Sequence, residues 1–113
     1  MNKKYWLFVG RWQPFHLGHY RLIKKKLDEG KNVLIACRDT EVGEKDPYSF
    51  KERRELIKRY LKKEIEDGKV QIILIPDIEG IAYGRDVGYA VEQIRLNAET
   101  ETISGTKIRN HEN

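Results

Sequence analysis

Two histidines three residues apart, His16 and His19, are the residues of this chain best suited to chemistry. They follow the apolar run 5–9 and a turn containing glycine and proline, and they directly precede a stretch that reads as a helix. Side chains at i and i+3 share one side of a helical turn. A helix N-terminus offers free backbone N–H groups and the positive end of the helix dipole. With the positive charge of Arg11 nearby, these residues predict a binding site for a polyphosphate.

A zinc site is the main alternative for a pair of histidines, and zinc requires further protein ligands. His111 is the one other histidine and lies in a polar tail, and Cys37 is the one cysteine. We therefore favour a phosphate role for His16 and His19 and expect no metal held by the protein alone.

Residues 10–19 read Gly-Arg-Trp-Gln-Pro-Phe-His-Leu-Gly-His. This run resembles the His-x-Gly-His signature of the nucleotidyltransferase superfamily. In its longer form it is most similar to archaeal-type nicotinamide mononucleotide adenylyltransferases and their small phage and bacterial relatives. The second signature of that family, Ile-Ser-Ser-Thr-x-Ile-Arg, resembles residues 103–109, Ile-Ser-Gly-Thr-Lys-Ile-Arg. The resemblance spans residues 5–109.

The resemblance implies transfer of a nucleoside monophosphate from a nucleoside triphosphate, ATP by the first motif, to a phosphorylated small molecule. A phosphate oxygen of the acceptor attacks the α-phosphate, pyrophosphate leaves, and Mg²⁺ arrives with the triphosphate. The implied catalytic residues are His16, His19 and Arg109, with His19 nearest the α-phosphate. The implied nucleotide-binding residues are Gly10, Arg11, Gly18, Ser104, Gly105 and Thr106.

Three further residues are candidates for contact with the acceptor or the triphosphate: Lys45, Arg53 and Asp39. Residues 47–49 and 52–53 resemble the family's Pro-Phe-Thr and Glu-Arg, and Lys45 lies in the preceding loop. Both Lys45 and Arg53 could instead be ordinary solvated charges. Arg54 competes with Arg53 for the same role. Asp39 could meet a ribose or a metal, or it could cap a loop.

Two other functions stay open. A CTP-dependent cytidylyltransferase of a phosphorylated alcohol is similar in length, but its usual first motif has Gly-Thr-Phe-Asp where this chain has residues 10–13. A non-catalytic nucleotide-binding module would bind without releasing pyrophosphate. The chain continues for four residues beyond Arg109, whereas archaeal-type enzymes carry C-terminal helices. We therefore expect a partner subunit, or a second domain in a longer natural chain, to complete the site. The chain could also form a homo-oligomer.

The elements that must position these residues alternate between strands and helices. Apolar runs predict strands at 5–9, 32–37 and 70–75, and helical spacing predicts helices at 18–29, 49–66 and 86–97, followed by a short strand at 101–103 and a short helix from 106. This order predicts one α/β domain over residues 1–113, with three layers and a Rossmann-like, mostly parallel sheet that has helices on both faces. Ligands bind where parallel strands end, so the polar stretch 38–47 is a candidate functional loop or lid.

Composition narrows the class of partner. No apolar run approaches the ~20 residues of a membrane span, and a single cysteine fits the cytoplasm. The net charge of +4 could indicate nucleic-acid binding. The basic residues are mixed with acidic ones on expected helices, however, and no RNA-binding signature is present. We therefore expect small-molecule substrates, without a nucleic-acid or membrane partner.

Overall fold

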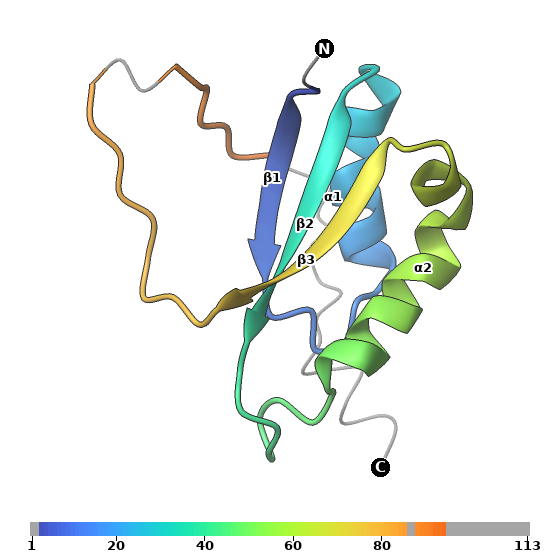
Figure 1. Ribbon diagram of the computed structural model, residues 1–113, viewed down its shortest axis with the longest axis vertical. Helices are drawn as coiled ribbons and strands as arrows, with labels where there is room; N and C mark the ends of the chain where they lie inside the picture. Colours follow the sequence, from blue (N-terminus) through green and yellow to red (C-terminus); the bar gives the residue numbers. More distant parts are fainter. Residues whose placement is uncertain (1–2, 86–87, 95–113) are drawn as a thin grey trace.

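Three parallel strands and two helices form the described part of the chain. The computed structural model describes residues 3–85 and 88–94. Its elements are β1 (Tyr5–Gly10), α1 (Leu17–Asp28), β2 (Asn32–Asp39), α2 (Phe50–Glu66) and β3 (Val70–Pro76). The strands pair in the order β1-β2-β3, and both pairings are parallel. A helix connects each strand to the next, which is how parallel neighbours are usually joined, and the predicted α/β class with a parallel sheet is confirmed (Figure 1).

The hydrophobic core lies between the sheet and both helices. Ile35 of the central strand is opposite Phe8 of β1 and Ile72 of β3. Alternate residues of a strand share one face, so these three side chains form one row. Ile35 is fully buried, as are Ile23 of α1 and Ile57 of α2, and all belong to one packed cluster. The two helices therefore cover the same face of the sheet.

The opposite face of the sheet is partly open within the described residues. Leu7 of β1 and Ile73 of β3 point to that side and are 55% and 37% exposed. The described residues thus form two layers. The third layer predicted from the sequence, with helices on both faces, is not formed by residues 3–85 and 88–94.

The helix predicted at 86–97 is wrong over residues 88–94, which are irregular. Gly88 has φ +77°, a left-handed conformation outside the helical region. A short helix depends on packing of its apolar side for stability, and Val91 is 65% exposed. Glu92 is instead held by Lys26 of α1, with 2.6 Å between Nζ and Oε2. The expected strand at 101–103 and the helix from 106 lie outside the described residues.

Both helices begin where the sequence predicts, within one residue. Ser49 accepts a hydrogen bond from the Glu52 backbone N–H, and the Glu52 side chain accepts one from the Ser49 backbone, which is the capping box expected at the start of α2. Among the described helices, none has the length and apolar character needed to cross a membrane.

Candidate functional site

The turn between β1 and α1 lies at the carboxyl edge of the sheet and has an unusual conformation at Trp12. Trp12 has φ +52°, which costs a non-glycine residue about 1–3 kcal/mol. Its indole is buried, and Nε1–H donates to the carbonyl of Ala36 in β2 at 3.1 Å. A Cβ at Gly10 would lie 2.9 Å from this ring. Gly10 is therefore required for the indole to pack against the end of β1, a structural role beside the nucleotide contact predicted for it.

His16 and His19 together cap the start of α1. The Nδ1 atom of His16 accepts a hydrogen bond from the Gly18 backbone N–H at 3.1 Å. The Nδ1 atom of His19 accepts one from the His16 backbone N–H at 3.2 Å. The two rings are stacked, with centroids 3.7 Å apart and planes 22° apart. The two imidazoles thus form a reciprocal cap, similar to the one that Ser49 and Glu52 form at α2.

This cap determines which nitrogen of each histidine carries the hydrogen. A neutral imidazole has one N–H and one acceptor nitrogen. Since Nδ1 is the acceptor in both rings, the hydrogen of each neutral ring is on Nε2. His16 and His19 each therefore have an N–H donor that the helix cap does not use.

Both histidines are held in the neutral form. Burial lowers the pKa of His16 below its ordinary value. Burial, and next the neighbouring His16, lower the pKa of His19 to about 3. The rings of Trp12 and Phe15 pack beside His19, with centroids 4.8 Å and 5.5 Å from that of His19. The pair thus supplies neutral hydrogen-bond donors at a helix N-terminus and does not act as a source of protons near neutral pH.

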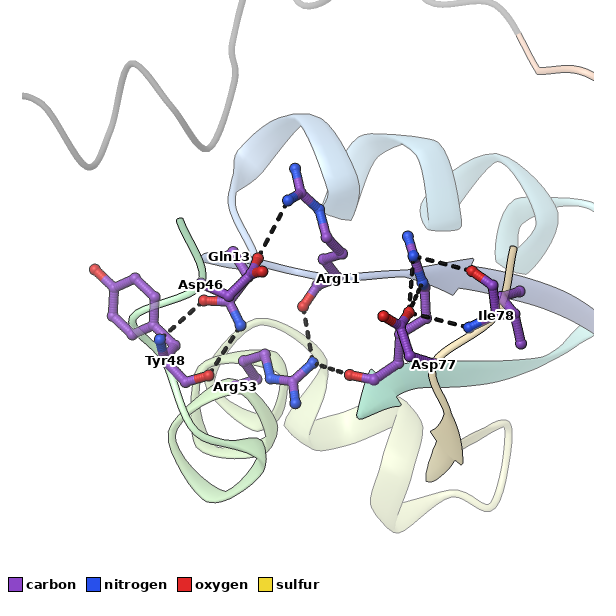
Figure 2. A network of polar contacts seen from close by, with 8 residues as sticks. Arg11, Gln13, Asp46, Tyr48, Arg53, Asp77 and Ile78 are labelled. Atoms are coloured by element: carbon purple, nitrogen blue, oxygen red, sulfur yellow. Dashed lines mark hydrogen bonds and ion pairs between the residues drawn. The ribbon is translucent and has the colours of Figure 1, made fainter. Parts of the chain in front are cut away.

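The loop between β2 and α2 is attached to this turn at two points. The Gln13 side chain, 4% exposed, donates to the Tyr48 carbonyl and accepts from the Tyr48 backbone N–H, each at 2.9 Å. The Arg11 guanidinium forms an ion pair with Asp46, with 3.2 Å between Nη1 and Oδ1. Figure 2 shows the Gln13–Tyr48 and Arg11–Asp46 contacts. The polar loop predicted as a lid is therefore anchored near its C-terminal end.

Lys45, Asp39 and Arg53 differ in their placement. Asp39 is the exposed last residue of β2, and Lys45 is exposed in the loop that follows. Arg53 is 1% exposed and donates to backbone carbonyls, among them those of Arg11 and Arg38. Its guanidinium is therefore engaged with the chain itself in this structure, and Arg53 differs from the other two in having no solvent-facing charge.

The structure thus brings together the first-motif residues predicted for the site: Gly10, Arg11, His16, Gly18 and His19. The second motif lies outside the described residues, and with it the predicted residues Ser104, Gly105, Thr106 and Arg109. Their placement stays a prediction.

A family model described as cytidylyltransferase-like matches residues 7–71, which is more than half of the chain. The chain belongs to the cytidylyltransferase-like family. The match extends from β1 into β3, and it includes the histidine turn and the loop attached to it. The family assignment thus rests on the same elements that build the candidate site.

Curated relatives of this family member are named nicotinamide-nucleotide adenylyltransferase. The protein from Thermococcus sibiricus is 37% identical over 75 residues, covering 64% of this chain and 40% of its own. The one from Thermoplasma volcanium is 30% identical, covering 72% and 52%. The one from Methanococcus aeolicus is 28% identical over 128 residues, covering 91% and 74%. The chain spans about half the length of the first two of these relatives.

Sequence reasoning missed the contacts that join the loops of this cytidylyltransferase-like domain. Arg38 donates to Asp77 at 2.8 Å and to the Ile78 carbonyl at 3.1 Å. Arg38 is the next-to-last residue of β2 and Asp77 directly follows β3, so their proximity could have been inferred because both parallel strands end at the same edge of the sheet. The double contact between Gln13 and Tyr48 had no comparable signal, because it depends on the path of a loop.

The described residues contain no group of three or more His, Cys, Asp and Glu side chains placed to hold a metal ion. Cys37 is buried, and its burial raises the pKa of the thiol to about 11. It therefore behaves as a small apolar core residue rather than as a nucleophile.

Proposed function

We propose that this chain carries a nucleotidyltransferase site that transfers a nucleoside monophosphate from ATP to a phosphorylated small molecule, with release of pyrophosphate. Nicotinamide mononucleotide is the first acceptor to test, because the curated relatives are named for adenylyl transfer to a nicotinamide nucleotide. The observation that carries the proposal is the stacked pair of neutral histidines, His16 and His19, at the N-terminus of α1.

The chemistry requires charge stabilisation more than a protein nucleophile. An oxygen of the acceptor phosphate forms a bond to the α-phosphorus, and the bond from that phosphorus to the bridging oxygen breaks. The electron pair leaves with pyrophosphate. Negative charge grows on the α-phosphate and bridging oxygens, where fixed donors lower the barrier. The Nε2–H groups of His16 and His19 supply such donors without transferring a proton, since burial lowers the pKa of His19 to about 3.

Other residues are proposed to bind the rest of the substrates. Arg11, 45% exposed, supplies a guanidinium that can bind phosphate oxygens. Gly10 and Gly18 allow close approach of backbone to the nucleotide. The β- and γ-phosphates are assigned to the second motif, Ser104, Gly105, Thr106 and Arg109. Lys45 and Asp39 remain candidates for the acceptor or the triphosphate.

Mg²⁺ is proposed to enter with the triphosphate. Magnesium usually keeps several water ligands and binds through substrate phosphates together with one or two carboxylates. Asp39, an exposed carboxylate at this sheet edge, is of the ligand type that Mg²⁺ prefers, and it would contribute to such a partly hydrated shell. The metal would neutralise charge on the phosphates when bound.

The test combines calorimetric titration with a pyrophosphate assay. We expect tighter binding of Mg-ATP than of Mg-CTP, and pyrophosphate release that requires both ATP and nicotinamide mononucleotide. Preference for CTP would replace the proposal with a cytidylyltransferase acting on a phosphorylated alcohol. ATP binding without pyrophosphate release across phosphorylated acceptors would indicate a nucleotide-binding module. Arg59→Ala, at an exposed position of α2, serves as the control variant.

A further inference from the structure

Arg53 is the largest fully buried side chain of the described residues, with 1% exposure. A charge removed from water is strongly disfavoured unless it is paired and hydrogen-bonded. Within residues 3–85 and 88–94, no carboxylate forms an ion pair with Arg53. In this part of the chain, no acidic side chain therefore pairs with the charge of Arg53. Ordinary core packing does not explain why an arginine is buried at this position.

The partners of Arg53 are three backbone carbonyls from three separate segments. Nη1 donates to the carbonyl of Arg11 at 2.9 Å and to that of Arg38 at 2.8 Å. Nε donates to the carbonyl of Ser49 at 3.3 Å. These carbonyls belong to the turn after β1, the end of β2 and the N-cap of α2. Figure 2 shows the Arg53 guanidinium directed at the Arg11 carbonyl.

The bond to Arg11 fixes the peptide that leads into the strained residue of the turn. The carbonyl of Arg11 belongs to the peptide bond with Trp12, whose φ is +52°. If this peptide rotated, the backbone that carries the Arg11 side chain would turn with it. The indole bond to Ala36 holds the far side of Trp12, so Arg53 and Ala36 together keep the turn in one conformation.

We propose that Arg53 is a positioning residue that sets the Arg11 guanidinium for the phosphates of the nucleotide. The inference rests on the proposed function, because it assigns Arg11 to those phosphates. Arg53 itself does not touch the substrate. It holds the Arg11–Trp12 peptide, and its uncompensated charge adds positive potential at the sheet edge where the phosphates are proposed to bind.

A double-mutant cycle with inorganic tripolyphosphate and Mg²⁺ separates positioning from a general effect on folding. The four proteins are the parent, Arg11→Ala, Arg53→Lys and the double variant, with Arg59→Lys as an exposed control on α2. Each single variant should raise the Kd about tenfold, the loss expected for one hydrogen bond to a charged group. The double variant should stay near tenfold, because Arg53 acts through Arg11. A loss of about a hundredfold in the double variant, or parent-like binding by Arg53→Lys, would overturn the inference.

A measurement without ligand keeps this inference distinct from the proposed function. In Arg53→Lys, hydrogen exchange of the Trp12 indole N–H should accelerate at least tenfold, whereas exchange of the Trp6 indole N–H should match the parent. Unchanged Trp12 exchange would refute the positioning role even if nucleotide binds. A parent that binds neither ATP, CTP nor tripolyphosphate would refute the proposed function, and the Trp12 exchange would still decide whether Arg53 holds the turn. If Arg53→Lys does not melt cooperatively, Arg53→Gln replaces it in the exchange measurement, because the amide keeps two N–H donors.

Discussion

Removing the Gln13 side chain tests how the loop between β2 and α2 is anchored. In Gln13→Ala, the Tyr48 backbone N–H and carbonyl each lose a hydrogen bond of 2.9 Å. A hydrogen bond contributes about 0.5–1.5 kcal/mol net, and a buried group left without a partner costs more. Since Gln13 is 4% exposed and Tyr48 is half-buried, the two bonds together predict a loss of about 2–3 kcal/mol in the free energy of unfolding.

Thermal and urea unfolding measure this loss directly. For a domain of this size, 1 kcal/mol corresponds to about 4 °C in Tm, so Gln13→Ala should melt about 8–12 °C below the parent. Gln13→Glu is the matched variant, because the carboxylate keeps the acceptor for the Tyr48 N–H but loses the donor to the Tyr48 carbonyl. It should be destabilised as well, since the carboxylate then faces that carbonyl. A change below about 0.5 kcal/mol in Gln13→Ala, the range of ordinary surface substitutions, would refute the anchoring role.

Three further predictions concern His19 and the Arg11–Asp46 ion pair. His19→Ala should lower kcat about 100-fold or more, because loss of one transition-state donor has an effect of that size. Its Tm should fall by less than about 8 °C. Loss of activity that only matches the loss of folded protein would contradict a catalytic role. Asp46→Asn should tighten tripolyphosphate binding a few-fold, because Arg11 is no longer shared with a carboxylate, and weaker binding would show that Asp46 instead orients Arg11. Burial lowers the pKa of folded His19 to about 3, against about 6.5 when unfolded. Between these pH values the unfolded state binds the extra proton, so stability should fall as pH decreases, by up to about 1.4 kcal/mol per pH unit. His19→Asn should flatten this slope in pH-dependent unfolding, and an unchanged slope would place the responsible group elsewhere.

The sequence predicted the elements whose signals are local. The apolar runs of β1, β2 and β3 and the capping box at Ser49 depend on near neighbours, and all were placed correctly. The sequence also placed His16 and His19 at the start of the first helix, where α1 begins. What the spacing did not predict is that each Nδ1 would be used by the backbone, because that requires the ring orientations.

The helix predicted at 86–97 is absent over residues 88–94 because the helical spacing is not matched by packing against the rest of the fold. Val87, Ala90, Val91 and Ile94 have helical spacing in the sequence, but spacing alone stabilises a short helix only weakly. Val91 remains 65% exposed, and the Lys26–Glu92 ion pair instead holds Glu92 against α1. A pattern thus predicts a helix reliably only where the fold supplies an apolar surface for it.

Arg53 illustrates the same limit at the site itself. Its position after Pro-Tyr-Ser in the sequence suggested a contact with substrate, and the motif alone does not distinguish it from the adjacent Arg54. The structure distinguishes the two arginines. Arg53 is fully buried and donates hydrogen bonds to backbone carbonyls. Arg54 is half-buried, and its guanidinium lies 5.6 Å from the Phe50 ring centroid. A helix turns by about 100° per residue, so only one of two adjacent arginines can face the sheet. The role of an arginine at this edge therefore depends on which side of α2 faces the strands. The apolar residues Ile57 and Leu61 lie on the same side of α2 as Arg53, so their spacing in the sequence already indicates that Arg53 faces the sheet.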